Sequence, residues 1–169
     1  MNIKIIQATG ENQIGLVKEL FLEYAESLDF ELCFQDFDKE LEGLPGDYSP
    51  PEGRLYIALY ENIPAGCIAL KKFKHSVCEM KRLYVRPKFR GNNIGKKLVE
   101  LLIIEARKIG YKKMVLDTVP SLQTAQKLYK SFGFHEIKPY RINPVKGAVF
   151  MELVLQNKTR EQAPLFNDI

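Results

Sequence analysis

Apolar residues recur along the chain with two different spacings, which predict the order of helices and strands. Apolar positions three and four residues apart predict amphipathic helices over 11–27, 94–109 and 122–132. A shorter helix is expected over 37–44, where Gly43 and Pro45 favour its end. Runs rich in β-branched and aromatic residues predict six strands, at 3–9, 54–60, 67–73, 77–85, 112–119 and 148–155.

The order of these elements, β-α-α-β-β-β-α-β-α-β, predicts a layered α+β domain with one mixed, mostly antiparallel sheet. Links of a few residues join the three strands between 54 and 85, which favours antiparallel pairing. The strand–helix–strand unit from Met80 to Val119 predicts a parallel crossover. A chain of 169 residues suits one domain. We expect residues 1–155 to form it and residues 156–169 to be a loosely held polar tail.

Composition and charge narrow the class of protein. The chain is 46% hydrophobic and 27% charged, which is typical of a soluble globular protein. The net charge of +4, from 25 basic and 21 acidic residues, is small for a nucleic-acid coat or a polybasic membrane anchor. We find no signal peptide and no apolar run near the roughly 20 residues that span a bilayer. A cytoplasmic protein without a nucleic-acid or membrane partner is therefore expected.

The cysteines and histidines indicate neither disulfides nor a metal site. Cys33, Cys67 and Cys78 are an odd number without CxxC spacing, which favours reduced, buried thiols. His75 and His135 are isolated, with no partner at metal-ligand spacing, and are expected at the surface. We therefore predict no catalytic metal.

The segment "VRPKFRGNNIGKKLVE", residues 85–100, joins a predicted strand to the long helix and has the character of an anion site. Seven Lys or Arg residues and no Asp or Glu lie between Lys81 and Lys97. N–H groups in the first turn of a helix attract anions, phosphates in particular. The P-loop pattern fails, because only three residues separate Gly91 from Gly95 and Lys97 stands where a hydroxyl is required. The dinucleotide fingerprint also fails, because one of its three glycines is missing.

A third pattern fits better. "RGNNIG", residues 90–95, resembles the [R/Q]-x-x-G-x-[G/A] acyl-CoA signature of the GCN5-related N-acetyltransferases, the GNAT family. Asn93 replaces the middle glycine, and Asn tolerates left-handed backbone angles better than most residues. "EMKRLYVRPKFRG" resembles the central strand of the family, and "AQKLYKSFGF", residues 125–134, resembles its later A-x-x-L-Y-x-x-x-G-F segment. "DTVPSLQTAQKLY" and "PYRINPVKGAVFMEL" are similar to a GNAT subgroup of bacterial proteins.

The resemblance implies a fold and a reaction. The central strand would splay from its parallel neighbour, and acetyl-CoA would be the co-substrate. A primary amine of a small molecule or peptide would attack it directly in a ternary complex. The residues implied in cofactor binding are Leu83, Tyr84, Val85, Arg90, Gly91, Asn92, Asn93, Ile94, Gly95 and Lys96.

Two catalytic roles follow from the same resemblance. Glu79 matches a frequent position of the general base, and Tyr129 matches the tyrosine that donates a proton to the departing thiolate. Each also has a structural interpretation, Glu79 as a solvent-facing or ion-paired strand residue and Tyr129 as a core residue. The resemblance also allows a homodimer. Residues expected to border the acceptor site are Tyr24, Phe34, Gln35, Tyr48, Asp117, Tyr140, Arg141 and Asn143.

Two alternative functions remain open at this stage. The basic surface at 81–97, with Tyr84 and Phe89 interleaved, would suit a nucleic-acid-binding module. A non-catalytic CoA-binding protein is the other alternative. In such a protein, replacing Glu79 or Tyr129 would cost little, whereas an enzyme would lose turnover and keep its affinity for the cofactor.

Overall fold

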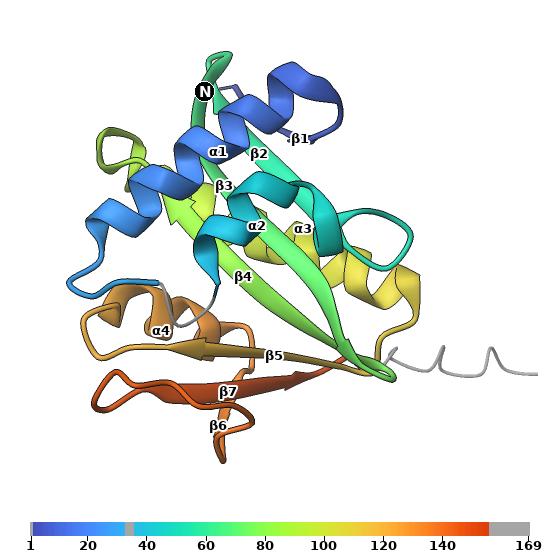
Figure 1. Ribbon diagram of the computed structural model, residues 1–169, viewed down its shortest axis with the longest axis vertical. Coiled ribbons are helices and arrows are strands. Elements are labelled where there is room, and N and C mark those ends of the chain that lie inside the picture. Colours follow the sequence, from blue (N-terminus) through green and yellow to red (C-terminus); the bar gives the residue numbers. More distant parts are fainter. Residues whose placement is uncertain (1, 33–35, 156–169) are drawn as a thin grey trace, which may run out of the picture.

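A computed structural model describes residues 2–32 and 36–155 and contains one mixed sheet in these ranges. The strand order is β1-β2-β3-β4-β5-β7-β6 (Figure 1). The strands are β1 (Ile3–Gln7), β2 (Arg54–Tyr60), β3 (Ile63–Lys74), β4 (Val77–Val85), β5 (Lys113–Thr118), β6 (His135–Ile137) and β7 (Val149–Val154). Every neighbouring pair is antiparallel except β4 and β5, which are parallel. The predicted mixed sheet and its parallel crossover are thereby confirmed.

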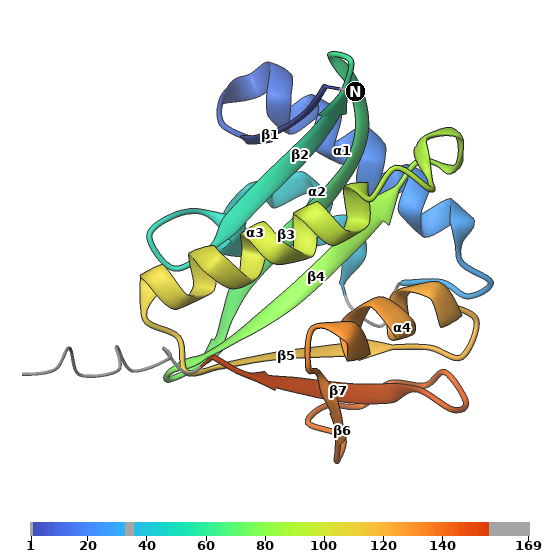
Figure 2. The same ribbon diagram turned by 180° about the vertical axis from the view of Figure 1, so that it is seen from behind.

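In the described part of the chain, four α-helices cover the two faces of the sheet. They are α1 (Gly10–Ser27), α2 (Phe37–Gly43), α3 (Ile94–Ile109) and α4 (Gln123–Ser131), each within one residue of its predicted range. Helices α1 and α2 lie on one face, and α3 lies on the opposite face (Figures 1 and 2). Two short 3-10 turns, η2 (Gly46–Tyr48) and η3 (Pro87–Phe89), complete the described elements.

The apolar stripes of the helices form two cores, one on each side of the sheet. Val17, Leu20 and Phe21 of α1 are fully buried in the first core, as their three- and four-residue spacing predicts. The apolar stripes of α3 and α4, including Leu98 and Tyr129, pack in the second core. Burying one large apolar side chain stabilises a fold by roughly 1.5–3 kcal/mol, so these stripes fix both layers.

Strand β6 is absent from the sequence-based prediction. It has only three residues, His135 and Glu136 are exposed, and its partner is β7 alone. A three-residue segment at the sheet edge shows no clear alternation of apolar and polar positions. Its strand conformation comes from pairing with β7 rather than from a local pattern.

The parallel strands β4 and β5 separate after a short paired region. Their register joins Val77 to Lys113 and Glu79 to Val115, but β4 continues to Val85 (Figures 1 and 2). Arg82 has a φ of 60° and lies where the β3–β4 register shifts, which marks a β-bulge. Such a bulge increases local twist and bends the strand. The expected splayed central pair is therefore present.

The structure describes two of the three cysteines, and several other predictions fall on residues outside the described ranges. Cys67 and Cys78 are buried free thiols, as expected, and burial raises the pKa of Cys78 to about 12. The polar tail at 156–169 and Cys33, Phe34 and Gln35 lie outside the described residues. Within 2–32 and 36–155, none of the helices is sufficiently long and apolar to cross a bilayer.

Candidate active site

A cavity of about 480 Å³ opens where β4 and β5 separate. Residues of α1, β4, the loop before α3, β5 and α4 line it. Its size suits a small-molecule site. The predicted site residues that line this cavity are Leu83, Tyr84, Val85, Arg90, Gly91, Asn93, Ile94, Gly95, Lys96 and Tyr129. Glu79 and Asn92 do not belong to its wall.

The loop before α3 has the backbone shape expected of the acyl-CoA signature. Asn93 adopts a left-handed conformation, with φ 61° and ψ 19°, at the N-cap of α3. Asn is among the few non-glycine residues that adopt this conformation readily, which explains how it replaces the usual glycine. Asn92 donates a hydrogen bond from Nδ2 to the Phe89 carbonyl at 2.9 Å. Its side chain thus holds the loop rather than facing the cavity.

This end of the cavity is positively charged. Arg90 and Lys96 line it, and the first N–H groups of the 16-residue helix α3 have no intrahelical acceptor. The helix dipole adds positive potential at the same point. A Cβ atom on Gly95 would lie 3.7 Å from the nearest side-chain atom, an ordinary contact. The protein itself therefore tolerates a side chain there, and glycine leaves space for a ligand.

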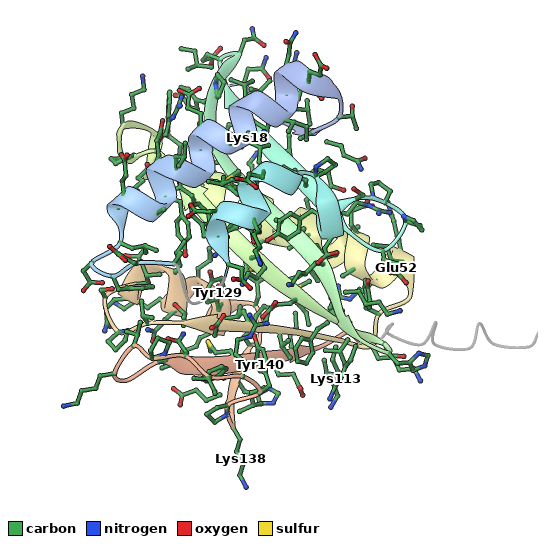
Figure 3. All side chains as sticks on the ribbon, in the orientation of Figure 1. Lys18, Glu52, Lys113, Tyr129, Lys138 and Tyr140 are labelled. Atoms are coloured by element: carbon green, nitrogen blue, oxygen red, sulfur yellow. The ribbon has the colours of Figure 1, made fainter. Side chains whose placement is uncertain are left out.

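Two of the residues that line the cavity, Tyr129 and Thr118, carry hydroxyl groups (Figure 3 labels Tyr129). Tyr129 is buried beside Phe134, and this burial raises the pKa of its phenol, so the group stays protonated. Thr118 is also buried, and its Oγ1 has no hydrogen-bond partner within the described part of the chain. An unpaired buried hydroxyl costs free energy.

Glu79 lies in a separate network beside the cavity. Tyr140, which Figure 3 labels, comes from the segment between β6 and β7 and donates a hydrogen bond to Glu79 Oε2 at 2.8 Å. Arg141 Nη2 donates to the same oxygen and forms an ion pair with Glu79. Glu79 is fully buried, and its Oε1 accepts no hydrogen bond from the described residues. The structure thus brings Glu79 to Arg141 instead of the cavity wall.

Asp117 is the carboxylate that does line the cavity. It is half-buried near the end of β5, and its Oδ2 accepts a hydrogen bond from Asn143 Nδ2 at 3.1 Å. Asn143 is itself held, because its Oδ1 accepts a hydrogen bond from the Val145 N–H at 3.0 Å. The sequence analysis placed Asp117 only at the border of the acceptor site. The available signal was an acidic residue directly after the apolar run "MVL".

Two basic residues of β4 also line the cavity, and the sequence analysis assigned them no role of their own. Lys81 and Arg82 are 6% and 5% exposed. Arg82 donates to both carboxylate oxygens of Glu40, at 2.8 and 3.1 Å. Burial lowers the pKa of Lys81 to about 8. Both side chains are buried in the structure, whereas the sequence analysis counted them as part of a basic surface.

The basic run at 81–97 is therefore divided between different environments. Lys81 and Arg82 are buried, and Arg86 donates hydrogen bonds to Glu19 and Glu23 of α1. These residues do not form one exposed basic surface. Lys81, Arg82 and Arg86 therefore do not contribute to the exposed basic surface that a nucleic-acid-binding module would require.

The other residues that the sequence analysis discussed lie in different parts of the fold. Tyr24 lines the cavity, whereas Tyr48 is buried in the first core and donates a hydrogen bond to Glu40 at 2.7 Å. His75 and His135 are exposed. Within the described ranges, no group of three His, Cys, Asp or Glu side chains is arranged to hold a metal ion.

A family model, a curated relative and two solved structures that are similar to this chain are all described as acetyltransferases. The model of the acetyltransferase (GNAT) family matches residues 16–134. An uncharacterised N-acetyltransferase of Schizosaccharomyces pombe is 42% identical over 154 residues, covering 90% of this chain and 94% of that protein. The crystal structure of a GNAT-family acetyltransferase from Staphylococcus aureus has a TM-score of 0.77 at 22% identity, covering 92% of this chain and 100% of that one. An N-acetyltransferase from Thermoplasma acidophilum, solved in complex with coenzyme A, has a TM-score of 0.70 at 18% identity, covering 91% and 99%.

Proposed function

The chain belongs to the acetyltransferase (GNAT) family, and from this we propose that it transfers an acetyl group from acetyl-CoA to a primary amine. The amine is carried by a small molecule or a peptide and attacks directly. One observation carries the proposal: a single cavity joins a cationic helix N-terminus to a carboxylate and a buried tyrosine. The coenzyme A complex of the Thermoplasma relative supports the choice of cofactor.

The residues at the cationic end fit the donor. Arg90, Lys96 and the first N–H groups of α3 would bind its diphosphate. Backbone groups of Leu83 and Val85, on the separated part of β4, would bind the arm that leads to the thioester. Acetyl-CoA supplies the acetyl group as a thioester.

The acceptor amine must lose a proton before it attacks. A free alkylammonium has a pKa near ~10.4, so a base close to the cavity is required. We assign this role to Asp117, because it lines the cavity and Asn143 fixes one of its oxygens. Glu79 is retained as the second candidate, since its Oε1 accepts no hydrogen bond from the described residues.

Tyr129 is assigned to the leaving group. Its raised pKa keeps the hydroxyl protonated at neutral pH, so that it can donate a hydrogen bond or a proton to a thiolate. Tyr129 belongs to α4 and lines the same cavity as the β4 residues Leu83 and Val85, which supports this assignment. A phenol beside the departing thiolate would stabilise its developing negative charge.

Calorimetric titration with acetyl-CoA tests the cofactor site. We expect selective binding over dephospho-CoA and NAD⁺, and about tenfold weaker binding after Arg90→Ala, since a charge-assisted hydrogen bond is lost. Lys113→Ala is the matched control, because Lys113 is an exposed lysine outside the cavity wall. Release of free thiol in the presence of amines then tests turnover. A protein that does not bind acetyl-CoA would contradict the proposal.

A further inference from the structure

The end of β4 that lines the cavity follows a β-bulge with a costly backbone conformation. The register of β3 with β4 shifts by one residue between Cys67 and Ala69. Two residues of β4, Arg82 and Leu83, therefore oppose the single residue Ile68 of β3. Arg82 has a φ of 60°, a left-handed conformation that is unfavourable for a residue with a Cβ atom. Such a conformation persists where the surrounding structure holds it.

The bulge decides which way the following residues of β4 face. Side chains of a strand alternate between its two faces, so one extra residue reverses the orientation of all that follow. Beyond the bulge, Tyr84 packs in the first core, and Leu83 and Val85 pack against the second core. Leu83 and Val85 are also the residues that we assign to the arm of acetyl-CoA. Loss of the bulge would therefore disturb this part of the donor site.

Side chains of α2 and β3 contact Arg82 at its guanidinium and at its carbonyl. Glu40 of α2 accepts hydrogen bonds from Arg82 Nε at 2.8 Å and Nη2 at 3.1 Å. The guanidinium carbon also lies 5.2 Å from the centroid of the Phe37 ring, in the same helix. The Cys67 thiol on β3 donates a hydrogen bond to the Arg82 carbonyl at 3.4 Å. Burial raises the pKa of this thiol, so it keeps the proton that it donates.

The charge of Glu40 is placed to hold the bulge from outside the cavity. The side chain of Arg82 is 3% exposed and that of Glu40 is 17% exposed, so the ion pair is largely buried. Removing one partner of such a pair leaves an uncompensated buried charge. Tyr48 donates a further hydrogen bond to Glu40 Oε1 at 2.7 Å, which fixes the carboxylate. Glu40 is not part of the described cavity wall, whereas Arg82 is.

We propose that Glu40 is a positioning residue for acetyl-CoA. It holds Arg82 in the left-handed conformation, which keeps the bulge formed and presents Leu83 and Val85 to the arm of the donor. This inference rests on the proposed function, because it concerns the donor site of the same reaction. It gives a role in that reaction to α2, which lies on the same face of the sheet as α1 and contributes no residue to the described cavity wall (Figure 1).

Two ligands separate this role from a general structural one. Acetyl-CoA has a diphosphate and the arm, whereas 3′-phosphoadenosine 5′-diphosphate has a diphosphate and no arm. We expect Glu40→Gln to weaken calorimetric binding of acetyl-CoA about tenfold, the factor that one unsupported left-handed residue would cost. Binding of the nucleotide should stay unchanged, because Arg90, Lys96 and the N-terminus of α3 are unaltered. Glu42→Gln is the matched control, an exposed glutamate of the same helix, and should change neither affinity.

A double-mutant cycle tests whether Glu40 acts through Arg82. Arg82→Gly places at the bulge the residue that adopts a left-handed conformation without strain, so the bulge no longer depends on Glu40. Adding Glu40→Gln to Arg82→Gly should therefore leave the affinity for acetyl-CoA equal to that of Arg82→Gly alone. Melting curves establish that each variant is folded. If Glu40→Gln does not fold, Glu40→Asp replaces it, because this change keeps the charge and withdraws the carboxylate from the guanidinium.

The possible outcomes separate the two proposals. An unchanged affinity for acetyl-CoA in the Glu40 variant would overturn the inference and leave the acetyltransferase reaction intact. Equal weakening of acetyl-CoA and of the nucleotide would do the same, and so would a full effect of the Glu40 variant in the Arg82→Gly background. An unaltered protein that does not bind acetyl-CoA would overturn the proposed function, and the inference with it.

Discussion

Asn143 donates a hydrogen bond from Nδ2 to Asp117 Oδ2 at 3.1 Å, across a separation of 26 residues. The contact ties the segment between β6 and β7 to the end of β5, at the wall of the cavity. A second tie, from Tyr140 and Arg141 to Glu79, fixes the same segment to β4. Two carboxylates are thus held by one segment, but only Asp117 lines the cavity.

This difference predicts which carboxylate takes up the proton of the amine. Asp117→Asn should reduce kcat/KM by about 100-fold or more, the usual effect of losing a general base. The affinity for acetyl-CoA, measured by calorimetry, should not change. Glu79→Gln is the matched variant and should have the smaller effect on turnover. If Glu79→Gln were the more damaging of the two, the role would pass to Glu79.

A second prediction concerns Tyr129. Tyr129→Phe removes the hydroxyl from the cavity wall and keeps the ring that packs against Phe134. We expect kcat to fall about 100-fold, because the leaving thiolate loses its donor, with little change in melting temperature. Binding of acetyl-CoA should persist. Normal turnover of this variant would reduce Tyr129 to the core residue that its burial also allows.

A third prediction follows from the left-handed backbone of Asn93. Asn93→Ala should destabilise the protein by about 1 kcal/mol and weaken acetyl-CoA binding, because a Cβ without a polar side chain is strained at this φ. Asn93→Gly removes that strain and restores the residue usual in the signature, so it should bind acetyl-CoA at least as well. Denaturant unfolding and calorimetry check both variants. Equal behaviour of Ala and Gly would show that the conformation does not matter.

The buried ammonium of Lys81 predicts the direction of a pH effect. Its pKa is about 8 in the fold and 10.5 in an ordinary setting. Between these values the unfolded chain binds a proton that the folded chain does not, so the contribution of Lys81 to the free energy of unfolding rises with pH. The charged groups that act on Lys81 are Arg82, Glu79, Arg141 and Asp117.

A comparison with Lys81→Met isolates this contribution from other groups that titrate in the same range. Buried phenols and thiols are common to both proteins, so their effects cancel in the difference. Denaturant unfolding from about pH 7 to about pH 10 should show the unaltered protein gaining stability relative to the variant. A difference that stays constant across this range would contradict the buried, shifted ammonium.

Local patterns in the sequence determined most of the fold. The apolar spacing of α3 and its start after the basic glycine loop were both readable from residues near in the chain. Strand β6 was not readable, because three residues at an edge depend on their partner. The acyl-CoA signature similarly indicated the positively charged end of the cavity, because the loop and the N-terminus of α3 are contiguous in the chain.

Only the tertiary structure decided which residues line the proposed acceptor end of the cavity. Strand alternation and the separation of β4 from β5 bring Lys81 and Asp117 to one cavity, and neither residue belongs to a local motif. Glu79 could be read as a base or as a paired residue until Arg141, 62 residues away, was placed beside it. A sequence pattern records how each segment folds against its own core. It does not record which side chains from distant segments form ion pairs or hydrogen bonds with one another. In this protein such contacts determine which carboxylate is paired and which one lines the cavity.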